Sequence, residues 1–251
     1  MTNVDHLMIF LLFVVQPVHG AWAWARYVAG IRAGEPPDRL RQYRATCILE
    51  WTAFAVLTIV WLYLERPPAA LGLVAPSGTG FWLGVALLVA ATGYLYRAWR
   101  QARRSSSEDR TKVVESLGDL RHFLPHTRRE YVSIVGLSIT AGIVEEIIYR
   151  GFVFWYLVQY MPMWAVVIVS AIAFGLGHSY QGIVGVRRVM LIGLAFGAYY
   201  LLTGSIWLPI AAHIMLDILQ CGTIYECLRD RAGEVPRAVR SGAGSAEADR
   251  R

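Results

Sequence analysis

The chain has 251 residues, of which 56% are hydrophobic and only 17% are charged. This balance excludes an ordinary soluble domain and predicts a membrane protein. The net charge of +6 does not predict a nucleic-acid-binding protein, because the basic residues gather in the connections between apolar segments and not along one stripe. Anionic lipid headgroups are the partner that we expect for them.

Seven stretches approach the ~20 apolar residues that cross a bilayer as a helix. They cover residues 5–30, 45–64, 80–99, 131–157, 163–179, 187–203 and 205–222. The first predicts a retained span and not a cleaved signal peptide, because Asp5 but no Lys or Arg precedes its apolar core. Pro17 and His19 interrupt this span and predict a kink. The predicted fold class is all-α, a polytopic membrane helix bundle of about seven transmembrane helices.

Arginines and lysines alternate between the connections. They are abundant after the first, third, fifth and seventh spans, and almost absent after the second, fourth and sixth. By the positive-inside rule, this pattern predicts an outside N-terminus and a cytoplasmic C-terminus. We expect a multi-pass protein of a bacterial inner (plasma) membrane.

The long connection between the third and fourth spans also contains a helical pattern. Val113, Val114, Leu117 and Leu120 recur there among charged residues, which predicts an interfacial amphipathic helix. The closing stretch SGAGSAEADRR is small, polar and unpatterned, as is typical of disorder. The predicted parts are N-terminal helices with a basic connection (1–124), a helical core (125–222) and a basic tail (223–251).

Two sets of residues favour structural roles. Cys47, Cys221 and Cys227 show neither the spacing of a metal site nor that of a disulfide framework, so we expect them to pack as small apolar residues. Glu50 lies near the predicted cytoplasmic end of the second span, where a snorkelling side chain costs little. We expect a structural or interfacial role for it.

Ionisable residues inside the last four spans are more informative, because a charge at the bilayer centre costs roughly 2.5–3.5 kcal/mol and normally serves a function. They are Glu145, Glu146 and Arg150 in the fourth span, His178 in the fifth, and His213 and Asp217 in the seventh. Glu146 and Arg150 can pair along one helix face, whereas Glu145 projects about 100° away. The spacing predicts that Glu145 stays free, the alternative being one buried network that only joins helices.

Two histidines near an unpaired glutamate favour the activation of water. A buried carboxylate can act as general base, and histidines can orient the water, donate to an oxyanion or protonate a leaving amine. His213 and Asp217 are four residues apart, which predicts that the aspartate accepts the imidazole N–H and fixes the ring.

Metal-dependent hydrolysis is the alternative. Glu145, His178 and His213 could form a zinc site of two histidines and one carboxylate. The sequence has no H-E-x-x-H motif, and each ligand would come from a different helix, so the spacing neither supports nor excludes zinc. We prefer metal-free catalysis and assign no metal ligand.

The same residues resemble a known family. EEIIYR, FGLGH and HIMLD match, in this order, the EExxxR, FxxxH and Hxxx[N/D] motifs of the CAAX-protease and bacteriocin-processing (CPBP, or Abi) intramembrane proteases. The resemblance covers roughly residues 125–220 and includes the flanking stretches LPHTRREY and TGSIWLPIAAH. Each motif is loose alone, but three in order within apolar spans are specific.

The resemblance implies an intramembrane endopeptidase that cleaves membrane-associated proteins near their C-terminus or membrane anchor. By position, Glu145 would be the base that acts with His178 on the attacking water. His213 and Asp217 would stabilise the oxyanion, and Glu146 with Arg150 would support them. Family members have been described both as glutamate proteases and as metal-dependent, so zinc stays open.

One position differs from the eukaryotic branch of the family, which usually has Asn where this chain has Asp217. An ionised aspartate cannot donate a hydrogen bond to an oxyanion. Either Asp217 is protonated or, as we prefer, it orients His213.

Two other function classes share part of these features. A non-catalytic membrane protein that binds a peptide and confers immunity would not need the complete glutamate and histidine set. A proton-coupled transporter would use similar residues, but the two halves show no inverted repeat. The substrate stays open between a prenylated CAAX protein, a bacteriocin leader and a C-terminal sorting signal.

Overall fold

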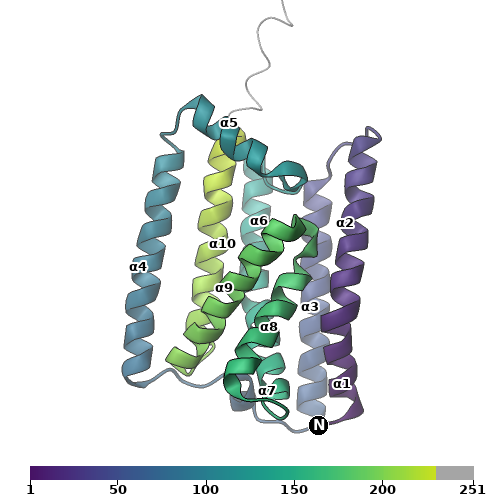
Figure 1. The fold of residues 1–251 in the computed structure, drawn as a ribbon, viewed down its shortest axis with the longest axis vertical. Helices are drawn as coiled ribbons and strands as arrows, with labels where there is room; N and C mark the ends of the chain where they lie inside the picture. Colours follow the sequence, from purple (N-terminus) through teal and green to yellow (C-terminus); the bar gives the residue numbers. More distant parts are fainter. Residues whose placement is uncertain (230–251) are drawn as a thin grey trace, which may run out of the picture.

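Long helices lie side by side in the computed structural model, which describes residues 1–229 (Figure 1). No β-strand occurs among these residues. The α-helices are α1 (Asn3–Phe10), α2 (Gln16–Arg32), α3 (Arg39–Tyr63), α4 (Gly78–Ala102), α5 (Ser107–Ser116), α6 (Arg128–Glu146), α7 (Phe154–Leu157), α8 (Met163–Gly177), α9 (Gly182–Thr203) and α10 (Trp207–Leu228). The π-helical segments are η1 (Leu11–Val15) and η4 (Ile147–Val153), and the 3-10 segments are η2 (Pro68–Leu71), η3 (Gly118–His122) and η5 (Ser179–Gln181).

Six helical stretches are long and apolar enough to cross a membrane, and α8 adds a shorter apolar helix of 15 residues. The six are Asn3–Arg32, Arg39–Tyr63, Gly78–Ala102, Arg128–Leu157, Ser179–Thr203 and Trp207–Leu228. Together with α8 they correspond to the seven predicted spans, and the all-α bundle is confirmed. Large apolar side chains such as Ile48, Ile59 and Trp82 are exposed, as expected for surfaces that contact lipid.

The last helix is longer than predicted. α10 ends at Leu228 and not near residue 222, because Cys227 and Leu228 are buried against Ala102 and Val114. The first residues of the predicted tail are therefore helical. The stretch SGAGSAEADRR lies outside the described residues.

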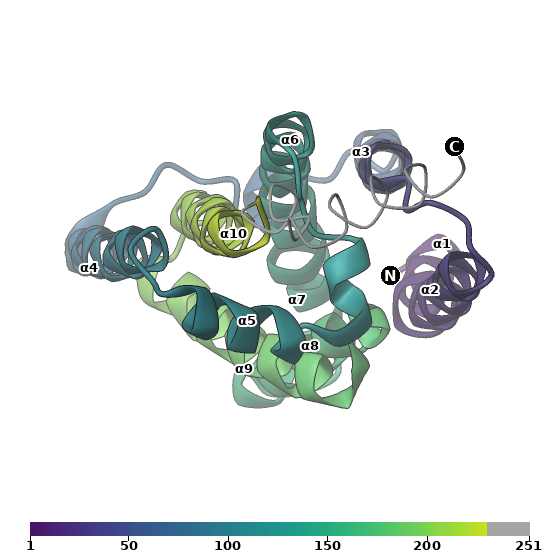
Figure 2. The ribbon, with the colours of Figure 1, turned by 90° about the horizontal axis from the view of Figure 1, so that it is seen from above.

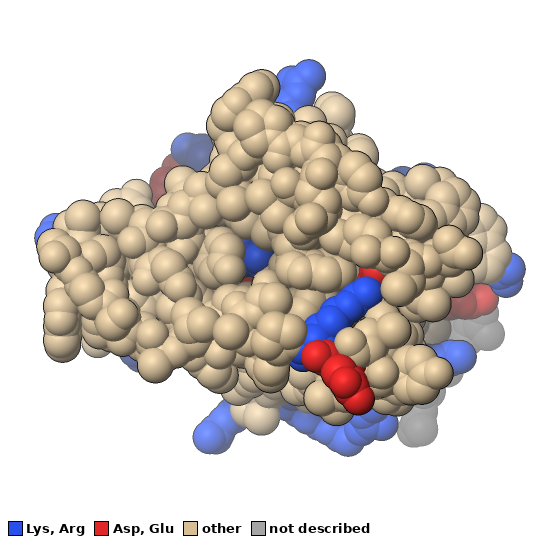
Figure 3. All heavy atoms as spheres, turned by 90° about the horizontal axis from the view of Figure 1, so that it is seen from below, with Lys and Arg blue, Asp and Glu red and all other residues tan. Residues whose placement is uncertain are grey.

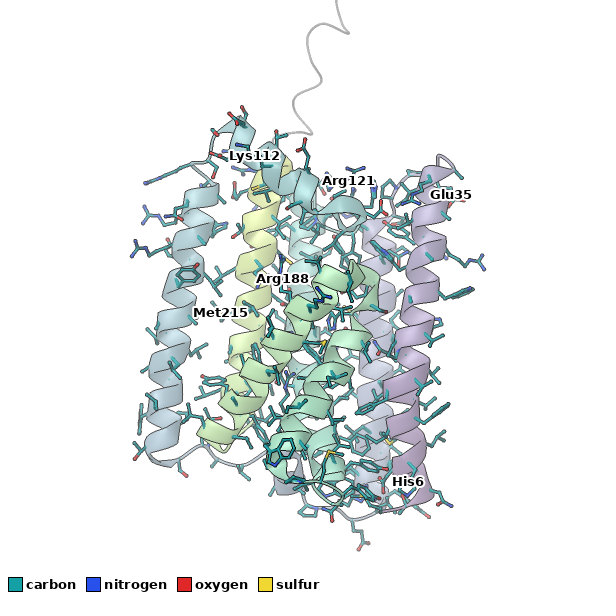
Figure 4. All side chains as sticks on the ribbon, viewed as in Figure 1. His6, Glu35, Lys112, Arg121, Arg188 and Met215 are labelled. Atoms are coloured by element: carbon teal, nitrogen blue, oxygen red, sulfur yellow. The ribbon has the colours of Figure 1, made fainter. Side chains whose placement is uncertain are left out.

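α5 and η3 lie across one end of the bundle, here named the basic end because Lys112 and Arg121 lie there (Figure 4). The predicted amphipathic helix is present as α5, and Val114 is buried in it. Leu117 and Leu120 follow the helix and pack on the same cluster as Val114. Most of its apolar residues thus cover the ends of α4 and α10.

α6 places the polar residues of the fourth span in the interior. It packs against α3 and α10, and Figure 2 shows these three helices along one side of the bundle, with α8 and α9 along the other. η4 continues α6, and all seven of its residues are buried. Since Glu145 and Glu146 end α6 directly before η4, their side chains begin from the best-packed part of the fold.

An ion pair is buried at the end opposite the basic end, where few charged residues are visible (Figure 3). Arg66 donates to both carboxylate oxygens of Asp5 at 2.7 and 2.8 Å, and Asp5 is 0% exposed. The backbone N–H and the hydroxyl of Thr2 donate to the same carboxylate. The Arg66 guanidinium also lies 4.5 Å from the ring centroid of Trp155, so this pair fastens α1 to α3 and α7.

Asp5→Asn should destabilise the protein, because it leaves the enclosed Arg66 guanidinium without a carboxylate. Breaking a buried pair costs about 3–5 kcal/mol, whereas exposed pairs contribute about 0–1 kcal/mol. The matched control is Asp119→Asn, which breaks the Arg32–Asp119 pair at the surface. Unfolding in detergent would measure both changes, and equal losses would contradict a special role for the buried pair.

Candidate active site

Glu146 and Arg150 form the ion pair that their spacing predicts. Arg150 Nη1 donates to Glu146 Oε1 at 2.8 Å, and the two side chains are 0% and 1% exposed. Arg150 Nη2 also donates to the Gly193 carbonyl of α9 at 3.2 Å. The guanidinium carbon lies 4.6 Å from the ring centroid of Phe174 and 5.4 Å from that of Phe196. Arg150 therefore neutralises Glu146 and at the same time joins η4 to α8 and α9.

His213 is oriented by Glu146, and not by Asp217 as its four-residue spacing predicted. Its Nδ1 donates to Glu146 Oε1 at 2.8 Å, whereas its Nε2 lies 3.8 Å from Asp217 Oδ2. The reason is the close crossing of α6 and α10 at Gly142, where a Cβ atom would lie 2.5 Å from Ile214 Cγ1 and 3.0 Å from the Ile214 nitrogen. This crossing brings Glu146 to the imidazole before Asp217 can reach it.

Glu145 is the carboxylate without a partner. Its Oε2 is buried and accepts no hydrogen bond from any described residue, and it lies 3.8 Å from His213 Nε2. Both nitrogens of His213 thus face carboxylate oxygens, an arrangement that a ring with two N–H groups satisfies. The Glu145 oxygen that accepts no hydrogen bond thus lies next to His213 Nε2.

His178 comes to this region from the end of α8. Its Nδ1 donates to the Phe174 carbonyl at 2.8 Å, and its ring lies 4.9 Å from that of Phe174. This contact leaves Nε2 available. The described part of the chain shows no hydrogen bond between His178 and Glu145.

Glu50 also faces the site, and the sequence interpretation missed it. Its Oε2 is buried without a donor among residues 1–229, and the charges of Glu145, His213 and Asp217 act on it. The misjudgement has a simple cause: α3 begins at Arg39 and not at residue 45. Glu50 is eleven residues into the helix, about 16 Å along its axis, and no longer near its end.

Gln16 is a second polar residue that the N-terminal spans contribute. It begins α2 directly after the π-helical η1, and its Nε2 donates to the Gly177 carbonyl at 3.3 Å. Ser179 donates to the Pro17 carbonyl at 3.2 Å. The helix is irregular at Leu11–Val15, just before Pro17, and Pro17 contacts Ser179, the residue after His178. The kink at Pro17 itself stays a prediction.

The donors of the zinc alternative converge only in part. Glu145 Oε2 and His213 Nε2 are 3.8 Å apart, but His178, the third predicted ligand, makes no described contact with either and bonds instead to the Phe174 carbonyl. Within the described ranges, no group of three or more His, Cys, Asp or Glu side chains is placed to hold a metal ion. This geometry does not fit a preformed zinc site.

The stretch of chain that carries these residues is similar to a known family. The family described as type II CAAX prenyl endopeptidase Rce1-like matches residues 127–219, the range that carries Glu145, Glu146, Arg150, His178, His213 and Asp217. Over this stretch, which is less than half of its length, the chain is similar to that family. The match supports a membrane protease in general, and the buried polar site between helices suits that class.

One curated protein to which this chain is similar comes from Bacillus subtilis (strain 168) and is named "Putative membrane peptidase YdiL". The two are 24% identical over 198 residues, which cover 75% of each chain. No solved structure matches the chain. The relative extends the likeness beyond the residues that carry the motifs.

Arg150→Ala should destabilise the helix bundle far more than Glu145→Gln. The first change leaves Glu146 buried without its cation, a loss of about 3–5 kcal/mol, whereas Glu145 has no protein partner to lose. Arg150→Lys should rescue little, since one ammonium group cannot replace contacts to both Glu146 and the Gly193 carbonyl. Arg188→Ala is the control, because Arg188 is exposed.

Unfolding of these four variants in detergent would measure the difference. If Glu145→Gln destabilised as strongly as Arg150→Ala, all three charges would belong to one structural network, the alternative that the sequence left open.

Proposed function

We propose that this protein is an intramembrane endopeptidase in which Glu145 activates the water that attacks a peptide bond. The observation that carries the proposal is the contrast between two adjacent glutamates. Glu146 accepts hydrogen bonds from Arg150 and His213, while Glu145 Oε2 is buried and accepts no hydrogen bond from the described residues. A buried, unpaired carboxylate beside an imidazole is suited to take a proton from water.

The other residues take complementary roles in this proposal. Glu146 fixes the His213 ring, so that the Nε2 of His213 can present an N–H to the oxyanion that forms on the substrate carbonyl. His178 uses the nitrogen that Phe174 leaves available to hold the attacking water. Asp217 lies beyond hydrogen-bond distance of His213, so its role is the electrostatic one of facing both histidines.

The proposed substrate is a membrane-associated protein that is cut near its C-terminus or its membrane anchor, because the site lies between the two ends of the bundle. The basic end would face the cytoplasm of a bacterial cell, by the positive-inside rule. The N-terminus would lie outside and α10 would end on the cytoplasmic side.

Glu145→Gln should abolish cleavage without unfolding the protein. A general base contributes about 10²–10⁴-fold to the rate, and the amide cannot accept the proton of water. The assay is reconstitution with tagged membrane proteins of the same organism and mass spectrometry of new termini. Glu35→Gln at the basic end (Figure 4) is the control, and cleavage by Glu145→Gln at the wild-type rate would refute the mechanism.

Asp217→Asn should retain most of the activity, within about tenfold of wild type. Its carboxylate makes no hydrogen bond with His213, so the ring stays fixed by Glu146. His213→Gln should lose far more, because oxyanion donors contribute about 10²–10³-fold. If Asp217→Asn and His213→Gln lost activity equally, Asp217 would be a direct participant.

Chelators should leave cleavage unchanged. In the part of the chain that the structure describes, Glu145, His178 and His213 do not form a group that is placed to hold a metal ion. The measurement is cleavage after treatment with EDTA or phenanthroline, with and without added Zn²⁺. A loss of activity that Zn²⁺ restores would establish the metal-dependent mechanism instead.

A further inference from the structure

The role of Glu50 is not explained by the roles proposed for the other residues. It lies on α3, outside the residues 127–219 that match the family. Its Oε2 is buried, and no group in residues 1–229 donates a hydrogen bond to it. An ionised carboxylate without cation or donor is costly to bury, so a structural role alone gives no reason for a glutamate here.

The ionisable groups that act on Glu50 come from α6 and α10 as well as from its own helix. Glu145 acts on it most strongly among the charged groups, followed by His213 and Asp217. Cys47 on the same helix and Tyr180 of η5 are its neutral titratable neighbours. The full cluster has four carboxyl groups, which belong to Glu50, Glu145, Glu146 and Asp217.

The positively charged side chains nearby are too few to pair with all four carboxyl groups. Arg150 and His213 are both committed to Glu146 Oε1, and His178 faces Asp217. In a low-dielectric site, neighbouring carboxyl groups do not all ionise, and at least one keeps a proton. Glu50, Glu145 and Glu146 each have a buried oxygen that accepts no hydrogen bond. Glu145 lies 3.8 Å from His213 Nε2 and Glu146 pairs with Arg150, whereas Glu50 forms no ion pair within residues 1–229.

We propose that Glu50 holds this proton and gives it to the leaving amine when the peptide bond breaks. The inference rests on the proposed function of Glu145. As the water oxygen bonds to the substrate carbonyl carbon, Glu145 accepts a proton from that water. As the C–N bond breaks, the nitrogen takes the proton of Glu50 and leaves as an amine. Glu145 is then protonated and Glu50 ionised, and one proton passing from Glu145 to Glu50 restores both.

The arrangement of the histidines supports this division of labour. The Nδ1 atoms of His213 and His178 donate to Glu146 and to the Phe174 carbonyl. In His213, Nε2 is directed between Glu145 and Asp217, where it suits the oxyanion. These contacts leave neither histidine to act as the general acid for the leaving amine, and a protonated Glu50 on α3 can take that role.

The test uses two substrates. One is a peptide with the cleavage site found by mass spectrometry, and the other is the same peptide with a thioester in place of the scissile peptide bond. A thiolate leaves without first taking up a proton, whereas an amine leaves only after its nitrogen has been protonated. Glu50→Gln, which keeps the shape and the hydrogen bonding but has no proton to give, should lower kcat on the peptide at least ~100-fold. It should change kcat on the thioester less than ~5-fold and leave KM unaltered.

Two controls separate this inference from the function on which it rests. Glu145→Gln should lose both substrates, because both need an activated water. Infrared difference spectroscopy of wild type against Glu50→Gln should show the loss of a protonated carboxylic-acid band, with no substrate present. That measurement does not depend on proteolysis.

Each outcome decides something. Equal loss of peptide and thioester cleavage in Glu50→Gln, or cleavage of both at the wild-type rate, overturns the assignment of Glu50 and leaves Glu145 in place. The assignment of Glu50 is also overturned if Glu50→Gln and wild type show the same carboxylic-acid bands in the infrared. If the wild-type protein cleaves neither substrate, the proposed function is refuted. Proton donation from Glu50 to a leaving amine is then refuted too, even if the infrared band shows that Glu50 is protonated.

Discussion

One carboxylate oxygen, Glu146 Oε1, organises the polar interior of this protein. It accepts hydrogen bonds from Arg150 and from His213, each at 2.8 Å, and Arg150 continues to the Gly193 carbonyl. Through this one atom, α6, η4, α9 and α10 are held in a fixed register. Buried ion pairs contribute little net stability compared with apolar packing, so their use here is better explained by the orientation that they impose on His213 than by stability.

The π-helical segment η4 makes this arrangement feasible. π-helical turns are rare and are often found at functional sites; this one begins directly after Glu146 and contains Arg150. All of its residues are buried against α8 and the core. The wider turn keeps Glu146 and Arg150 in contact while Arg150 reaches between Phe174 and Phe196.

Much of the site could be predicted from the sequence, because charges inside apolar spans are few and their spacing is local information. The Glu146–Arg150 pair and the free Glu145 follow from helical geometry alone. The partner of His213 did not, since the spacing to Asp217 says nothing of how closely α6 approaches α10. Glu50 was misjudged because hydropathy placed the start of α3 six residues late, and a shift of that size moves a side chain from the end of a helix to its interior. No local pattern marks η4, whose shape depends on packing.

Residues of the first span stabilise the irregular backbone on which His178 lies. α8 has only 15 residues, and its connection to α9 lies between the two ends of the bundle, as do the start of α9 (Figure 1) and Arg188 within it (Figure 4). Irregular backbone at such depth is tolerated only where protein groups satisfy it. Here Gln16 donates to the Gly177 carbonyl, and Ser179 donates to the Pro17 carbonyl. The π-helical η1 and the proline that follows it thus supply, from the N-terminal half, the contacts that let α8 stop at the level of Glu145. The motifs of the last four spans carry the residues proposed for the chemistry, and α2 and α3 add Gln16 and Glu50 to the polar groups near them.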